Sequence, residues 1–318
     1  MGAPPIVTAN KLPLLGLIQQ AAQELGIRSP SQIFGASDNQ TIQLLALANR
    51  EGRDFFNAGM RKDGWQALRQ QNVFNLTGIT GYTGTTTVGS YTMTNISPSL
   101  TGSGIAAGWG MIDEGFPWDS HVVSFTSNTV TLDTPASSNQ VGETVSFGQD
   151  SYPLPNDFTS YMTSTSWDRD FRWQLLGPID AQEWQVLKSG ISPTGPRRRF
   201  RIMGNLWYVD PVPTAPETCV FEYYSNAWCQ SSAGAAQNSW QADTDYYSLD
   251  DDAFILGLKW RFLAAKKLDF TQERQTYDLL VSRLMAVDGA NRDLPINAQA
   301  SGIRLLNEQN VPDTGYGS

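Results

Sequence analysis

Apolar residues recur at helical spacing near the start of the chain. The pattern predicts a first helix over 12–25. A second helix is expected to begin at Ser37, because Gln40 three residues later completes a capping box, and to break near Gly59. A third, short helix is expected over 62–71. Together these elements predict a small helical unit at the N-terminus.

A second set of helical patterns lies toward the other end of the chain. Ser248 is interpreted as the N-cap of a helix whose first turn carries the aspartates 250–252, a favourable arrangement at the positive end of a helix. Another helix is expected from Thr271 to the residue before Gly289. Short helices cannot bury their apolar faces alone, so the two sets are expected to pack together as one bundle.

Between these helices the sequence changes to a β pattern. Alternating residues around a turn at 127–128 predict a β-hairpin, and a second hairpin is expected over 199–209, with its turn at the Gly-Asn pair 204–205. A short helix started by Asp180 is expected to precede the second hairpin, and a further strand is expected over 218–228. These signals indicate two inserted β regions.

The predicted fold class is α+β, with a discontinuous helical bundle, inserted β-rich lobes and an extended C-terminal arm. The expected segments are the N-terminal helices (1–72), a small β module (73–150), a β domain (151–247), the C-terminal helices that complete the bundle (248–289) and the arm (290–318).

Charge is segregated along the chain, whose net charge is −9. All 22 lysines and arginines lie in residues 1–69, 169–201 and 259–318, whereas 70–168 and 202–258 contain none and carry eight acidic residues each. Surfaces that grip DNA neutralise its phosphates with basic side chains, so this balance argues against DNA binding as the main role. Acidic loops that only keep a large assembly soluble would give the same pattern. No apolar run approaches the ~20 residues of a membrane-spanning helix.

Half of the ten tryptophans fall between Trp167 and Cys229, in the same block as an arginine cluster. The strand pattern puts Arg199 and Arg201 on one face and Phe200 on the other. A phosphate site and a salt-bridged subunit contact both fit such a cluster. The contact is favoured, because the acidic stretches of the same chain supply partners. The residues expected to make it are Arg197, Arg198, Arg199, Arg201 and Trp207.

No constellation of residues points firmly to catalysis, and the chain is not expected to be an enzyme. The carboxylate pairs Asp113 with Glu114 and Asp168 with Asp170 are candidates for glycoside cleavage, but neighbouring carboxylates are common. No phosphate-binding loop or nucleophile elbow is present.

No cofactor and no metal are expected. The single histidine, His121, has no second histidine and no carboxylate at ligand spacing, and is interpreted as structural. The aspartates 250–252 lack the alternating spacing of a calcium loop. Cys219 and Cys229 are expected to be reduced thiols, although a bridge between neighbouring segments is an alternative.

Five strings in order along the chain resemble the tail tubular protein A-like head-to-tail adaptors of short-tailed bacteriophages. They are YPLPNDF (152–158), TSWDRDFRW (165–173), GPIDAQEWQVLKSG (177–190), RRFRIMGNLWYVDP (198–211) and FEYYSNAWC (221–229). The stretch 108–132 also looks like a small β module that recurs in phage virion proteins.

The resemblance implies a structural virion protein at the head–tail junction, assembled in the host cytoplasm. It would form a homo-oligomeric ring, with twelve copies expected, between the portal above and the tail nozzle below. Genome DNA would pass through the lumen without specific binding, and no membrane is involved. The tail 290–318 is expected to be a docking arm, anchored by Ile303, Leu305 and Leu306, that orders against the portal or a neighbouring subunit.

Two other function classes remain open. A tail-associated enzyme that degrades the cell wall would need an acid and a carboxylate partner in a cleft. A receptor- or carbohydrate-binding module would need exposed aromatic side chains on the small β module, for which Trp109, Trp118, Tyr82 and Tyr91 are the candidates. Buried tryptophans there would count against the second class.

Overall fold

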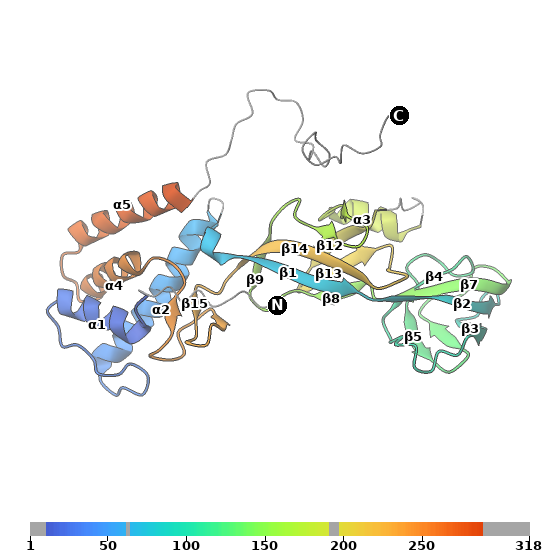
Figure 1. Cartoon of the computed structure of the whole chain (residues 1–318), viewed down its shortest axis with the longest axis horizontal. Helices are drawn as coiled ribbons and strands as arrows, with labels where there is room; N and C mark the ends of the chain where they lie inside the picture. Colours follow the sequence, from blue (N-terminus) through green and yellow to red (C-terminus); the bar gives the residue numbers. More distant parts are fainter. Residues whose placement is uncertain (1–10, 62–63, 191–196, 289–318) are drawn as a thin grey trace, which may run out of the picture.

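The computed structural model describes residues 11–61, 64–190 and 197–288. The molecule is elongated, with a helical bundle at one end, a central β region and a small β module at the other end (Figure 1). It is an α+β fold, as the sequence predicts.

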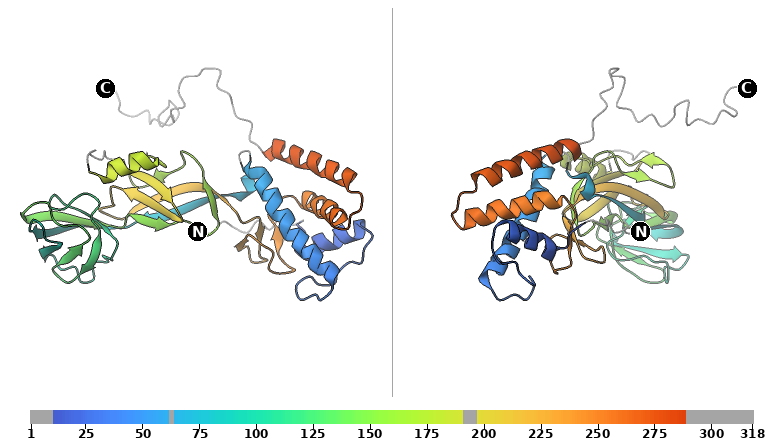
Figure 2. Two further views of the ribbon diagram at one scale, coloured as in Figure 1. Left: turned by 180° about the vertical axis from the view of Figure 1, so that it is seen from behind. Right: turned by 60° about the vertical axis from the view of Figure 1, so that its left-hand side comes forward.

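The bundle joins helices from the two ends of the chain. Its members are α1 (Leu14–Glu24), α2 (Asn39–Met60), α4 (Asp251–Ala265) and α5 (Thr271–Asp288). α4 packs against each of the other three, so it is the centre of the bundle. The rear view shows α1 and α2, from the N-terminal part of the chain, beside α4 and α5, from the C-terminal part (Figure 2). The expected pairing of N- and C-terminal helices is therefore confirmed.

The N-caps differ from the prediction by one or two residues. α2 begins after Asp38, whose carboxylate accepts a hydrogen bond from the Thr41 N–H, and not after Ser37. α4 begins after Asp250, whose carboxylate accepts from the Ala253 N–H, and not after Ser248. In both cases an aspartate competed with the serine, and its negative charge is also stabilised by the helix dipole.

The third predicted helix is wrong. The segment forms one short 3-10 turn, η1 (Gln66–Leu68), and then runs straight into the strand β1 (Arg69–Leu76). Trp65 and Leu68 are buried as expected, with the Trp65 ring stacked on Phe55 at 4.7 Å. Pairing of β1 with β14 over eight residues outweighs the weak helical pattern of this stretch.

The central region contains two antiparallel sheets that share an aromatic core. The first sheet consists of β1, β14 (Glu217–Ser225), β10 (Trp167–Asp168), β11 (Trp173–Gln174) and β9 (Phe158–Tyr161). The second consists of β12 (Arg199–Met203), β13 (Leu206–Asp210) and β8 (Ser151–Pro153). The helix α3 (Ala181–Lys188) is capped by Asp180, which confirms the predicted short helix. The antiparallel pairing of β12 with β13 confirms the predicted hairpin.

The small module is a six-stranded antiparallel sheet. Its strands, in spatial order, are β4 (Gly110–Ile112), β7 (Gln140–Gly148), β2 (Gly78–Thr86), β3 (Thr92–Ser97), β6 (Val130–Leu132) and β5 (Val122–Phe125). β5 and β6 form the predicted hairpin. The sheet encloses an apolar core that includes Met93, Val145 and Phe147, all fully buried.

The segment after β14 packs against the bundle. It carries a small sheet of β15 (Cys229–Gln230), β16 (Ala236–Gln237) and β17 (Tyr246–Tyr247). Trp228 and Tyr247 from this segment are buried in the bundle core. The approach is close: a Cβ on Gly52 of α2 would lie 2.4 Å from the Trp228 ring, so only glycine fits there. The segment boundaries 72/73, 150/151, 247/248 and 289/290 remain predictions.

Candidate functional site

The β12–β13 hairpin divides its side chains as the strand pattern predicts. Phe200 is fully buried, while Arg199 and Arg201 on the opposite face are partly exposed. The Arg201 guanidinium donates a hydrogen bond to the Asp180 carbonyl oxygen at 3.1 Å. Arg197, just before the strand, is exposed. Three of the four clustered arginines are therefore at the surface, where another molecule can reach them.

Arg198 is held within its own chain. Its Nε donates to the Glu217 carboxylate at 2.7 Å, and its Nη1 donates to the carbonyl oxygens of Pro211 and Val212 at 2.9 and 3.1 Å. Glu217 is 4% exposed. This paired arrangement ties the start of β12 to β14 and leaves Arg198 with a structural role inside the subunit.

Trp207, the fifth residue expected at a subunit contact, is 1% exposed. Its ring is stacked between Phe200, at a centroid distance of 3.9 Å, and Phe221, at 4.6 Å. An aromatic side chain enclosed on both faces belongs to the core of the central region. Trp207 thus supports the arginine face from behind, and its own surface is not available to a neighbour.

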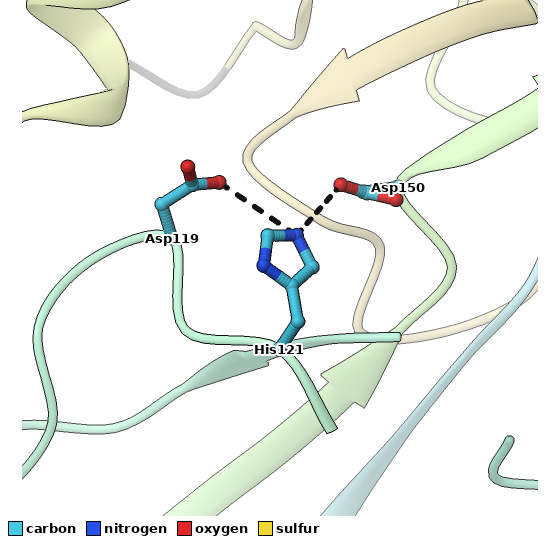
Figure 3. A group of neighbouring side chains, drawn as sticks. All are labelled: Asp119, His121 and Asp150. Atoms are coloured by element: carbon cyan, nitrogen blue, oxygen red, sulfur yellow. Dashed lines mark hydrogen bonds and ion pairs between the residues drawn. The ribbon is translucent and has the colours of Figure 1, made fainter. Parts of the chain in front are cut away.

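His121 lies at the base of the small module in a cluster of carboxylates (Figure 3). Its Nε2 is 3.0 Å from the Asp150 carboxylate and 3.7 Å from that of Asp119, and its Nδ1 is 3.4 Å from that of Asp133. The expectation that no carboxylate accompanies this histidine is therefore wrong. Asp133 could have been found from the hairpin, because Val122 pairs with Leu132 and the flanking residues 121 and 133 must then be neighbours.

The cluster favours positive charge at the imidazole. The hydrogen bond to Asp150 raises the pKa of His121, and the charges of Asp150 and Asp119 act in the same direction, against the effect of burial. Burial acts to raise the pKa of Asp150, but the His121 hydrogen bond and the charge of Lys188 outweigh it and lower that pKa. Each partner stabilises the charged form of the other.

Lys188 joins this cluster to the central region. Its ammonium lies 2.7 Å from the Asp119 carboxylate and 3.5 Å from that of Asp210. The Trp118 indole N–H donates to the same Asp210 oxygen at 3.2 Å, whereas the second oxygen of Asp210 is buried without a hydrogen-bond partner. Trp118, Asp119 and His121 thus connect the small module to α3 and β13.

The carboxylate pairs considered for catalysis have local structural roles. Asp168 is 2% exposed and accepts hydrogen bonds from the N–H groups of Asp170 and Phe171. The Asp170 carboxylate in turn accepts from the Thr218 N–H. Asp113 accepts from the Phe116 N–H, and burial raises its pKa to about 6. These bonds give Asp113, Asp168 and Asp170 structural roles in local turns and loops.

The remaining candidates lie as follows. Trp109 is 8% exposed and belongs to the core of the small module. A buried tryptophan there counts against a carbohydrate-binding surface. Trp118 and Tyr82 are half-buried, and Tyr91 is 52% exposed. Cys219 and Cys229 are free and buried, and burial raises the pKa of the Cys219 thiol to about 12. Asp250 caps α4, and Asp251 and Asp252 lie in its first turn. Ile303, Leu305 and Leu306 lie outside the described residues.

Comparison with known proteins places the chain in a family. The model of the SU10 adaptor protein family matches residues 127–302, more than half of the chain. The chain belongs to the SU10 adaptor protein family. The resemblance to phage head-to-tail adaptors is thereby confirmed, and the protein has a structural adaptor role in a bacteriophage virion. No protein with a curated description matches the chain.

The matched region covers the β5–β6 turn, the strands β6 and β7 of the small module, the central region except β1, and the helices α4 and α5. It therefore contains the arginine hairpin and Asp133 and Asp150 of the His121 cluster, whereas Asp119 and His121 themselves precede it. Within the described residues, no helix has both the length and the apolarity needed to cross a membrane.

Proposed function

We propose that this adaptor forms a closed ring that joins the portal of the virion to the tail nozzle. The observation that carries the proposal is membership of the adaptor family, which the charge pattern and the exposed arginine face support. A head-to-tail contact between identical subunits closes into a ring when its rotation divides a full turn. Twelve copies are the number implied by the resemblance to tail tubular protein A-like adaptors.

Arg197, Arg199 and Arg201 are proposed to contact the acidic surface of the next subunit. Arg197 is exposed and Arg199 and Arg201 are partly exposed, and the Arg201 guanidinium donates a hydrogen bond to the Asp180 carbonyl oxygen at the start of α3. A single copy offers acidic stretches without any basic residue, 70–168 and 202–258, as complementary partners. Arg198 and Trp207 are proposed to contribute indirectly, because they hold the hairpin in place from within the subunit.

The lumen of the ring is proposed to be the channel for genome DNA. A wall poor in lysine and arginine does not trap phosphates, so DNA can slide past it. The segment 290–318 is proposed to dock on the portal or on a neighbouring subunit through Ile303, Leu305 and Leu306. The ring is proposed to assemble in the host cytoplasm, before the head and the tail join.

Electron microscopy of the purified protein mixed with the portal protein of the same phage tests this function. The expected image is a ring stacked coaxially on the portal ring. Particles that remain single subunits and leave the portal bare would contradict the proposal. A ring that forms without the portal but does not bind it would support oligomerisation and reject the docking role.

Charge reversal tests the arginine contact separately from the fold. The triple substitution Arg197→Glu, Arg199→Glu and Arg201→Glu is expected to abolish ring formation while the thermal unfolding of the subunit changes little. Arg53→Glu on the exposed surface of α2 is the matched control and should leave assembly intact. Rings of normal size from the triple variant would show that the contact lies elsewhere.

A further inference from the structure

The His121 cluster contains more negative charge than its permanent cations balance. Four carboxylates, those of Asp119, Asp133, Asp150 and Asp210, surround one imidazole and one ammonium group. Asp150 and Asp210 are 6% and 1% exposed, and each faces one of the two cations. The side chains of Asp119 and Asp133 are 35% and 44% exposed. A bound cation would reduce the repulsion among the four carboxylates.

The distances between the ligand atoms match those around a small metal ion. The Nε2 atom of His121 and one oxygen each from Asp119 and Asp150 all lie within 4.8 Å of one another. Ligands bound at about 2.1 Å from a shared ion are about 3 to 4 Å apart, depending on the angle between them. The two measured separations from Nε2, 3.0 and 3.7 Å, fall within that interval.

Asp133 orients the imidazole as metal sites require. Its carboxylate faces Nδ1 of His121 at 3.4 Å and also accepts the backbone N–H of His121 at 2.8 Å. A carboxylate at Nδ1 keeps the proton on that nitrogen, so a metal ion would displace the proton on Nε2, which is hydrogen-bonded to Asp150, and bind the lone pair left there. The Asp133 carboxylate thus lies on the Nδ1 side of His121, and the carboxylates of Asp119 and Asp150 lie on its Nε2 side.

A small cavity adjoins two of the three proposed ligands. It has a volume of about 10 Å³ and is lined by Asp119 and His121 together with Lys188 and Asp210. The Lys188 ammonium lies 2.7 Å from the Asp119 carboxylate, and the Asp210 oxygen that accepts from Trp118 lies 3.5 Å from the same ammonium. If Asp119 binds an ion, the Lys188 ammonium still faces the carboxylate of Asp210.

We propose that Asp119, His121 and Asp150 bind one divalent ion of the first transition row, such as Mn²⁺ or Zn²⁺. One imidazole nitrogen with two carboxylates suits these ions better than the all-oxygen sites that Ca²⁺ and Mg²⁺ prefer. Asp119 and His121 precede β5, whereas Asp150 lies between β7 and β8. The bound ion would fasten the hairpin base of the small module to the link that leads into the central region.

Mn²⁺ provides a direct test, because the 318-residue chain has a single histidine. The protein is stripped of metal with a chelator, titrated with MnCl₂ and measured by electron paramagnetic resonance. One Mn²⁺ per chain is expected to bind, and pulsed spectra are expected to show coupling to one directly bonded ¹⁴N nucleus. This readout uses the unaltered protein and does not depend on the folding of a variant.

Substitutions then identify the ligands. Asp119→Asn is expected to weaken Mn²⁺ binding at least about tenfold. Glu114→Gln, at an exposed carboxylate of the same loop, is the matched control and should leave the affinity unchanged. Absence of binding, binding without nitrogen coupling, or equal affinities in the two variants would each overturn the proposal.

Discussion

The helical bundle and the small β module differ in the sequence separation of the residues that form their cores and in the polarity of those cores. The bundle closes only when residues 14–60 meet residues 251–288, and its core encloses an ion pair between Glu51 and Arg261. The module is built from one continuous stretch, 78–148, and its core is apolar. The His121 cluster lies at its base, where it meets the central region. The bundle therefore depends on contacts distant in sequence, and the module on local ones.

The largest expected difference concerns isolated fragments. A fragment of residues 77–149 should fold by itself, because its end strands β2 and β7 are paired and bring Gly78 beside Gly148. A fragment of residues 11–61 should stay unfolded, because α1 and α2 lose the apolar surface of α4. Circular dichroism with thermal melting distinguishes the two outcomes. A cooperative transition in the helical fragment, or none in the module, would overturn the contrast.

A smaller but still large effect is expected from the buried charges of the bundle. Glu51 is fully buried, accepts hydrogen bonds from Arg261 at 2.5 Å and from the Tyr277 hydroxyl at 2.7 Å, and has its pKa raised by burial. Glu51→Gln leaves the Arg261 charge without its main partner, so the bundle should lose about 3 kcal/mol of stability toward urea.

The neighbouring surface pair provides the control for this substitution. Arg50 faces Asp54 one turn along α2 at 3.6 Å, and its side chain is 68% exposed. Arg50→Gln should cost less than about 0.5 kcal/mol, because solvent screens such pairs. Equal losses for the two variants would mean that burial of the Glu51 pair does not matter.

The smallest expected effect lies in the module and depends on pH. Burial raises the pKa of Asp113 to about 6, above its ordinary value of 3.8, so the folded module favours the protonated carboxyl. The contribution of this group to stability is complete below pH 4 and is lost as the pH rises to 6. Asp113→Asn should stabilise the module by about 1 kcal/mol at pH 7.5, after allowance for partial exposure, and by less at pH 4.

Urea unfolding at the two pH values measures this difference. Arg53→Gln, at an exposed residue of the bundle helix α2, is the control for the stability assay at the two pH values. Destabilisation by Asp113→Asn at pH 7.5 would show that the hydrogen bond from Phe116 needs a charged acceptor, and would contradict the expected sign.

Local patterns predicted the regular elements well. The helices with a long apolar stripe and the two hairpins are where the sequence puts them, because helical spacing and turn residues are properties of neighbouring positions. The prediction of a short helix over 62–71 was wrong because it, too, used only neighbouring positions. Nothing within that stretch reveals that Val73 pairs with Val220, yet this pairing decides its conformation.

The candidate site was only partly predictable. The exposure of Arg199 and Arg201 follows from strand alternation, but the burial of Trp207 depends on Phe221 from another sheet. The partner of Arg198 at Glu217 is likewise set by the pairing of distant strands. For His121, the register of its hairpin implies Asp133, whereas Asp150 approaches only after the module is folded and joined to β8.

Electron microscopy of particles from cells infected with a phage that lacks this gene tests the central claim most directly. An adaptor that joins portal to nozzle predicts heads filled with DNA that carry no tail, with tail components left separate. Supplying the protein in trans should restore complete virions. Complete, tailed particles in its absence would contradict a role at the head–tail junction.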